Sequence, residues 1–166
     1  MKQAITFILA VVLFSACESE KEKLIRSEFT KIQAHWVINS FTFSANTPDS
    51  LKNDLKKGEM ILRKCNYDDK KNKTDALACS GEIEINKFSF GIFYRYLYDE
   101  RLYEFALAVL NGDATYQNKP NNPHQRIARL MNGEWDITAT DNTLTAKQTK
   151  NQRGLPYLVS FTAVKK

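Results

Sequence analysis

The chain has 166 residues, of which 24 are Lys or Arg and 19 are Asp or Glu, so its net charge is +5. This length is enough for one domain with a hydrophobic core. The basic residues are spread along the chain, whereas a nucleic-acid-binding face needs them clustered, so the charge indicates a solvated surface and excludes nucleic acid as an expected partner. The aromatic content of 11% is typical of packed β structure.

The N-terminal segment, residues 1–17, has the order of a secretory signal. Lys2 precedes an apolar run that ends at Phe14, and two small residues then lead to Cys17. A basic start, a short apolar stretch and small residues before a cleavage point define such a signal. The run is too short to cross a bilayer, which takes about 20 apolar residues. We therefore expect residues 1–16 to be removed as a signal peptide.

The end of this segment, Phe14-Ser15-Ala16-Cys17, resembles the lipobox of bacterial lipoproteins. In that class the cysteine receives lipid chains such as palmitate, and the leader is cut off in front of it. The resemblance therefore implies that Cys17 is lipidated and that the protein lies in the bacterial cell envelope, anchored to a membrane that we expect to be the outer membrane. The charged stretch after it, Glu18 to Lys23, predicts a flexible tether.

A short amphipathic helix is predicted over residues 23–33, where apolar residues recur at helical spacing. They are Leu24, Ile25, Phe29 and Ile32. We expect this helix to close one end of the fold, and a helix lying on the membrane is the alternative. The expected organisation is a leader over 1–16, a lipidated tether and helix over 17–33, and one domain over 34–166.

The first strand is predicted over residues 34–44, with Trp36, Ile38 and Ser40 on one face. Residues 49–58 predict a short helical connection, which packs on the surface or serves as a lid over a pocket. Two further strands, over 59–67 and 76–85, flank a hydrophilic loop.

Two cysteines remain once Cys17 is assigned to lipid, and an even remainder in an oxidising compartment points to a disulfide. Cys65 and Cys79 lie on the two strands of the hairpin just described. Pairing them sets Arg63 opposite Gly81, and directly opposed strand residues have the close Cβ atoms that a disulfide needs. In the chain-entropy model the cross-link would stabilise the fold by about 3 kcal/mol.

Residues 88–98 give the cleanest alternation in the chain, after a predicted two-residue turn at Asn86-Lys87. Residues 102–110 also alternate, and we favour a strand there over a helix, which their spacing also fits. After a turn over 111–113, the remaining elements are predicted in this order: a short strand over 114–117, a loop over 118–124, one or two helical turns over 125–131, and strands over 134–139, 143–150 and 155–164.

About eight or nine strands joined mostly by hairpins predict an all-β fold, an antiparallel up-and-down barrel. The stretch Ala34-His35-Trp36 resembles the opening of lipocalin-like domains, where a small residue, any residue and Trp begin the first strand. Gly133-Glu134-Trp135 has the same pattern near the other end. The resemblance covers residues 32–165 and implies the lipocalin-like, or calycin, barrel. A Trp can fill the tapering end of a small barrel while its indole N–H finds a carbonyl, so Trp36 and Trp135 are predicted barrel plugs.

No group of residues has the pattern of a catalytic centre. Glu82 and Glu84 alternate with apolar residues, which indicates the solvent-facing side of a sheet rather than a catalytic, glycosidase-like carboxylate pair. The two histidines, His35 and His124, are far apart in the sequence, and there is no CxxC. We therefore expect no enzyme activity, no cofactor and no metal site.

One row of aromatic residues is a candidate ligand-binding site, because an eight-stranded barrel either fills with side chains or holds one small ligand. Its members are Phe88, Phe90, Tyr94, Tyr96, Tyr98, Tyr103 and Phe105. The sequence thus predicts an exported, lipid-anchored binding protein that holds a small apolar or amphipathic ligand in its barrel. The alternative is a solid-core envelope protein that binds a protein partner through its outer surface, as an accessory subunit or inhibitor.

Overall fold

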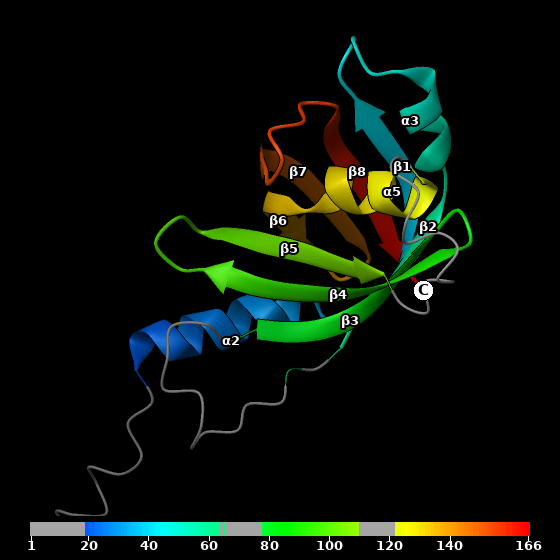
Figure 1. The fold of residues 1–166 in the computed structure, drawn as a ribbon. Helices are drawn as coiled ribbons and strands as arrows, with labels where there is room; N and C mark the ends of the chain where they lie inside the picture. Colours follow the sequence, from blue (N-terminus) through cyan, green and yellow to red (C-terminus); the bar gives the residue numbers. More distant parts are fainter. Residues whose placement is uncertain (1–18, 64, 66–77, 110–121) are drawn as a thin grey trace, which may run out of the picture.

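The computed structural model describes residues 19–63, 65, 78–109 and 122–166. In this part of the chain, eight antiparallel strands follow one another in sequence order around a closed barrel (Figure 1). The strands are β1 His35–Phe43, β2 Gly58–Leu62, β3 Ala78–Ile85, β4 Phe88–Leu97, β5 Leu102–Val109, β6 Gly133–Ala139, β7 Thr143–Asn151 and β8 Leu158–Lys165. The predicted all-β, up-and-down barrel of the lipocalin-like type is confirmed.

Three helices accompany the barrel in the described residues, namely α2 Glu20–Ile32, α3 Asp49–Asp54 and α5 Pro123–Met131. None of them is long and apolar enough to cross a membrane. The predictions for residues 1–18, 66–77 and 110–121 lie outside the described residues.

Both helices that flank the barrel begin earlier than the sequence pattern predicted. Ser19 caps α2, so the predicted tether gives way to helix from Glu20 onward. Asn122 caps α5 by accepting a hydrogen bond from the Gln125 amide, with Pro123 in the first helical turn, where its missing N–H costs nothing. His124 was predicted in a loop and instead belongs to α5.

Two local predictions about strands are confirmed. Residues 102–109 form β5, as favoured over a helix. The turn between β3 and β4 has positive φ at both of its central residues, 54° at Asn86 and 71° at Lys87. Such a two-residue turn matches the right-handed twist of the strands that it joins.

The face predicted for β1 holds for only half of the strand. The pairing with β8 shifts between Ile38 and Ser40. Trp36 and Ile38 are buried, but Ser40 is exposed and Phe41 packs against the core in its place. A β-bulge adds one unpaired residue and so exchanges the two faces of the strand beyond it.

The register predicted for the β2–β3 hairpin is wrong by one residue. Leu62, and not Arg63, lies opposite Gly81. Directly paired residues share a face, so the observed register places Met60 and Leu62 inside the barrel with Ile83. The predicted register would have brought the outward-facing Arg63 to the core side.

Helices close both ends of the barrel. Ile25, Phe29 and Ile32 of α2 are buried in the core, as are Ile127 and Leu130 of α5. These two helices meet opposite ends of β4, because Phe29 of α2 contacts Tyr94 whereas His124 of α5 contacts Phe88.

Each of the two helices is joined to the next strand through a tryptophan. Trp36 Nε1 donates a hydrogen bond to the Ile32 carbonyl at 2.7 Å, and Trp135 Nε1 donates to the Met131 carbonyl at 3.0 Å. Both indoles are at most 1% exposed. In each case the acceptor lies four residues before the Trp, at the end of the helix, so one arrangement is used twice.

Candidate binding site

The predicted ligand-binding row lies inside the barrel. Five of its members are buried, namely Phe90, Tyr94, Tyr96, Tyr103 and Phe105, and Phe88 and Tyr98 are partly buried. The structure therefore brings the row together, as the alternation of β4 and β5 predicts. It also adds residues that the row did not include, because Trp135 of β6 and Phe161 of β8 face the same interior.

The interior side chains pack ring against ring. Tyr94 contacts Phe29 of α2 at a centroid distance of 5.6 Å and Phe105 of β5 at 6.4 Å. The series continues across the barrel from Phe105 to Trp135 at 6.1 Å, and from Trp135 to Phe161 at 5.2 Å. Most of these contacts have the edge-to-face geometry that aromatic pairs prefer. The row thus forms part of the hydrophobic core.

Two tyrosine hydroxyls of the row, those of Tyr94 and Tyr103, find partners within the protein. Tyr94 donates to the Arg63 carbonyl at 2.6 Å. The hydroxyl of Tyr103 lies 3.0 Å from both the carbonyl and the carboxylate Oε2 of Glu28 in α2. Burial, reinforced by the negative charge of Glu28, raises the pKa of Tyr103 well above its ordinary value. A ligand is therefore not required to satisfy these groups.

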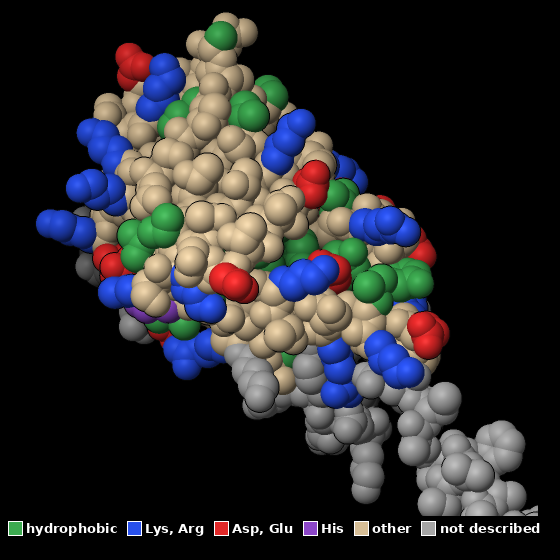
Figure 2. Space-filling model, turned by 180° about the vertical axis from the view of Figure 1, so that it is seen from behind, with side chains coloured by type: hydrophobic (Ala, Val, Ile, Leu, Met, Phe, Trp, Pro, Cys, Tyr) green, Lys and Arg blue, Asp and Glu red, His purple; other side chains and the backbone are tan. Residues whose placement is uncertain are grey.

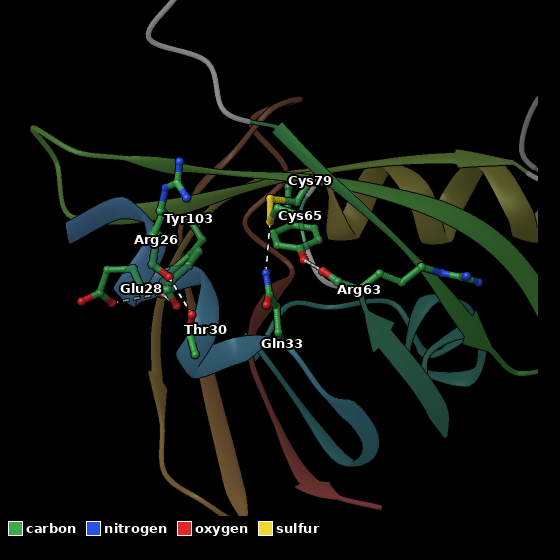
Figure 3. The surroundings of a disulfide bond; sticks show 9 residues. Arg26, Glu28, Thr30, Gln33, Arg63, Cys65, Cys79 and Tyr103 are labelled. Carbon is green, nitrogen blue, oxygen red and sulfur yellow. Dashed lines mark hydrogen bonds between the residues drawn. A yellow bond between two sulfur atoms is a disulfide. The ribbon is translucent and has the colours of Figure 1, made fainter. Parts of the chain in front are cut away.

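The predicted disulfide between Cys65 and Cys79 is confirmed (Figure 3). Their Cα atoms are 5.0 Å apart, although the chain leaves the β2 ladder at Leu62. Gln33, at the end of α2, points its side chain at the bridge and lies 3.1 Å from Cys65 Sγ. The bridge therefore joins the exit of β2 to β3 next to the helix that closes this end of the barrel.

A groove of about 770 Å³ lies over β1, β2, β3 and the turn that follows β3. Its outward side chains include Val37, Ile61 and three carboxylates, and its rim carries two lysines. The carboxylates are Glu59, Glu82 and Glu84, and the lysines are Lys57 and Lys87. The groove thus combines a lining that is more apolar than polar with charges of both signs.

Large apolar side chains are exposed close to this groove. Ile61 lines it and is 36% exposed, Phe93 of β4 is 54% exposed, and Val164 of β8 is 38% exposed. Phe93 pairs with Ser80 on one side and with Ala106 on the other, so its ring stands between small neighbours. Strands β8 and β1 to β4 thereby present an outer face with an exposed aromatic ring; we call the region that contains Phe93, Ile61 and the groove the β1–β4 face.

Ion pairs surround the apolar side chains on the β1–β4 face. Arg63 pairs with Glu82, and the carboxylate of Glu59 lies 2.7 Å from His35 Nε2 and 3.1 Å from Lys166 Nζ. Hydrogen bonds from Lys166 and His35 lower the pKa of Glu59, which stays ionised. Lys166 and His35 therefore fix the position of the Glu59 carboxylate in the groove lining.

The face of the molecule behind the view of Figure 1 is different. Figure 2 shows Lys, Arg, Asp and Glu side chains scattered around a broad area of uncharged polar groups and backbone, with hydrophobic side chains in small separate groups. On β7, Thr145 is exposed and pairs with the exposed Thr162 of β8. Thr145, which lies on a strand outside the β1–β4 face, serves as the comparison position for that face.

The sequence contains a signal for one of the two features that were not predicted from it. A bulky aromatic residue at Phe93, on the polar side of an otherwise clean alternation, marks an exposed apolar residue. The contribution of Glu28 to the barrel interior had no such signal, since it depends on how α2 docks. Cys17 lies outside the described residues, and among the described ones no group of three or more His, Cys, Asp or Glu side chains could hold a metal ion.

Comparisons of the chain with protein-family models, with curated proteins and with solved structures find no match.

Proposed function

We propose that this protein is an exported, lipid-anchored binding protein with a solid barrel, which binds a protein partner through its β1–β4 face. The observation that carries the proposal is the packed interior. The residues expected to hold a ligand contact one another, and the hydroxyls of Tyr94 and Tyr103 are bonded within the protein. Helices α2 and α5 bury their apolar faces at the two ends. Of the two functions predicted from the sequence, binding through the outer surface fits this interior better.

The β1–β4 face has features that protein interfaces use. Their binding energy is concentrated in a few exposed aromatic or aliphatic anchors within a rim of polar and charged groups. Phe93 and Ile61 are such anchors, and the Arg63–Glu82 pair lies beside them. The groove itself has a lining that is more apolar than polar, with three carboxylates and two lysines among its residues, so it offers a partner both apolar contact and charge pairing.

The anchor belongs to the proposal because it sets where a partner is met. The lipobox-like end of the leader supports lipidation of Cys17, and the disulfide supports folding in an oxidising compartment. The proposed location is the bacterial envelope, with the outer membrane as the expected site. The proposed role is binding, without catalysis.

Site-specific photo-crosslinking in the native membrane tests the β1–β4 face. A photoreactive residue at Ser80, exposed and paired with Phe93, should give one discrete protein adduct. The same residue at Thr145, which is also exposed and lies on β7, should give none. Adding Phe93→Ser should abolish the Ser80 adduct while lowering stability by no more than about 1 kcal/mol, since just over half of Phe93 is exposed.

Three outcomes would count against this site. An adduct equally strong at Ser80 and Thr145 would mean that the partner does not prefer the β1–β4 face to the surface of β7. Failure to form an adduct at Ser80, or an adduct that survives Phe93→Ser, would remove Phe93 as an anchor.

A further inference from the structure

We infer that the lipid anchor fixes the orientation of the barrel on the bilayer, with the β4–β5 turn and the start of α2 facing the lipid headgroups. This inference rests on the proposed lipidation of Cys17 and deepens it, because it names the surface that the membrane covers. It depends on three features, which are the short link to the anchor, the firm attachment of α2, and the side chains at that end of the barrel.

The link between the anchor and the folded domain is very short. Helix α2 begins at Glu20, and a single residue separates Cys17 from the N-cap Ser19. The cap is complete, since Ser19 Oγ accepts from the Glu22 amide at 3.2 Å and the Glu22 carboxylate accepts from the Ser19 amide at 3.0 Å. Two residues span at most about 7 Å when extended. The start of α2 must therefore stay close to the lipid surface.

Helix α2 is held firmly by the barrel, so its position determines that of the whole domain. Phe29 and Ile32 are at most 1% exposed, and Tyr103 of β5 donates to Glu28. Near its start, Lys21 lies with its Nζ 5.3 Å from the ring centre of Tyr98, which begins the β4–β5 turn. A rigid helix with a short link leaves the barrel little freedom to turn over.

The end of the barrel near the start of α2 suits a headgroup layer. Figure 1 shows that α2 begins at the same end of the molecule as the β4–β5 turn. Leu24 is 39% exposed there, and Tyr98 is partly buried. Charged side chains of both signs lie around them, which suits a zwitterionic headgroup layer; they are Lys21, Lys23 and Arg101 together with Glu20, Glu22, Asp99 and Glu100. Tyrosine and basic side chains with an apolar neighbour are the types found at membrane interfaces.

The other end of β4 carries the Asn86-Lys87 turn, which lines the groove. The ten residues of β4 span about 30 Å at the rise of a strand. This orientation therefore directs the rim of the groove away from the bilayer, where a protein partner can reach it.

Depth-dependent fluorescence quenching tests the orientation on the full lipoprotein, purified from its own membrane and placed in phosphatidylcholine vesicles. Glu100→Cys in the β4–β5 turn and Lys87→Cys at the far turn are matched variants, because both positions lie in turns. A bimane label on the Glu100→Cys variant should be quenched several-fold more by a lipid with a nitroxide headgroup than the same label on the Lys87→Cys variant. Inserting about eight Gly and Ser residues after Glu18, with a reach of about 16 Å, should reduce that difference.

The mass of the N-terminal peptide, measured on the same samples, separates the two proposals. An acylated Cys17 with equal quenching at both positions would overturn the orientation and leave the anchor intact. A Cys17 without acyl chains would overturn the anchor and the orientation together.

Discussion

At the scale of single residues, Tyr103 shows how the barrel and its closing helix depend on each other. Its ring packs on Tyr96 at 5.0 Å, and its hydroxyl reaches Glu28 of α2. The Glu28 side chain is only 16% exposed and also pairs with Lys31. One hydroxyl therefore joins β5 to a largely buried carboxylate and to the backbone of α2.

Replacing Tyr103 by Phe should lower the free energy of unfolding by about 1–2 kcal/mol. The change removes a hydrogen bond and leaves a carboxylate with poor solvent access short of one donor. Urea denaturation measures the effect. Tyr98→Phe is the control, because the ring over which Lys21 lies is kept, and it should change stability by less than about 0.5 kcal/mol. Equal effects of the two substitutions would contradict the role given to the Tyr103 hydroxyl.

The same residue should make the protein sensitive to alkaline pH. An unfolded tyrosine loses its proton near pH 10, whereas the raised pKa of Tyr103 keeps its proton in the folded state. Above about pH 10 the unfolded state therefore binds fewer protons, and stability falls as pH rises. Urea midpoints between about pH 10 and 12 should fall less steeply for Tyr103→Phe than for the unchanged protein. Parallel slopes would show that this proton is not linked to folding.

At the scale of the elements, alternation along the chain predicts which residues share a face but not which residue they oppose. The pattern of residues 88–98 therefore gave the inner face of β4 correctly, and the Asn86-Lys87 turn followed from its length. The bulge after Ile38 and the one-residue shift opposite Gly81 were not visible, because both depend on how neighbouring strands fit a curved barrel.

The start of α2 was missed for a different reason. The charged composition after Cys17 indicated a tether, although Ser19 and Glu22 have the spacing of a capping box. The local capping signal was the better guide. Missing this signal mattered, because the short link between Cys17 and the folded domain follows from the early start of α2.

Removing the disulfide should weaken the hairpin that it closes. The double variant Cys65→Ala, Cys79→Ala should lose about 3 kcal/mol of unfolding free energy, because the open chain regains the entropy of a loop with a sequence separation of 14. Urea denaturation of the oxidised protein with and without a reductant should give the same difference, which controls for the packing of the alanines. A midpoint that does not respond to reductant would contradict this stabilisation.

At the scale of the whole molecule, a closed barrel has no free sheet edge along its paired strands, and here its ends are covered by helices. The sequence pattern was sufficient for this architecture and for the interior position of the aromatic row. It was not sufficient for the choice between a hollow and a filled interior, because that depends on Phe29 and Trp135 reaching the same space from different elements.

Loss of the proposed anchor should release the protein from the membrane. Cys17→Ala is expected to leave the domain folded, since Cys17 precedes every described element, but to shift the protein out of the washed membrane fraction. The Cys65→Ala, Cys79→Ala variant, which keeps Cys17, should remain in that fraction. Unchanged fractionation of Cys17→Ala would show that lipid on this residue is not what holds the protein.

Native mass spectrometry of the full lipoprotein, extracted from its own membrane in mild detergent, tests the solid barrel most directly. Because the interior is packed from Phe29 to Phe161, we expect the measured mass to be that of the acylated, disulfide-bonded chain, with no small molecule bound in stoichiometric amount. A stoichiometric added mass that survives Phe93→Ser and collisional removal of detergent would place a ligand within the barrel, and it would contradict a protein that works through its outer surface alone.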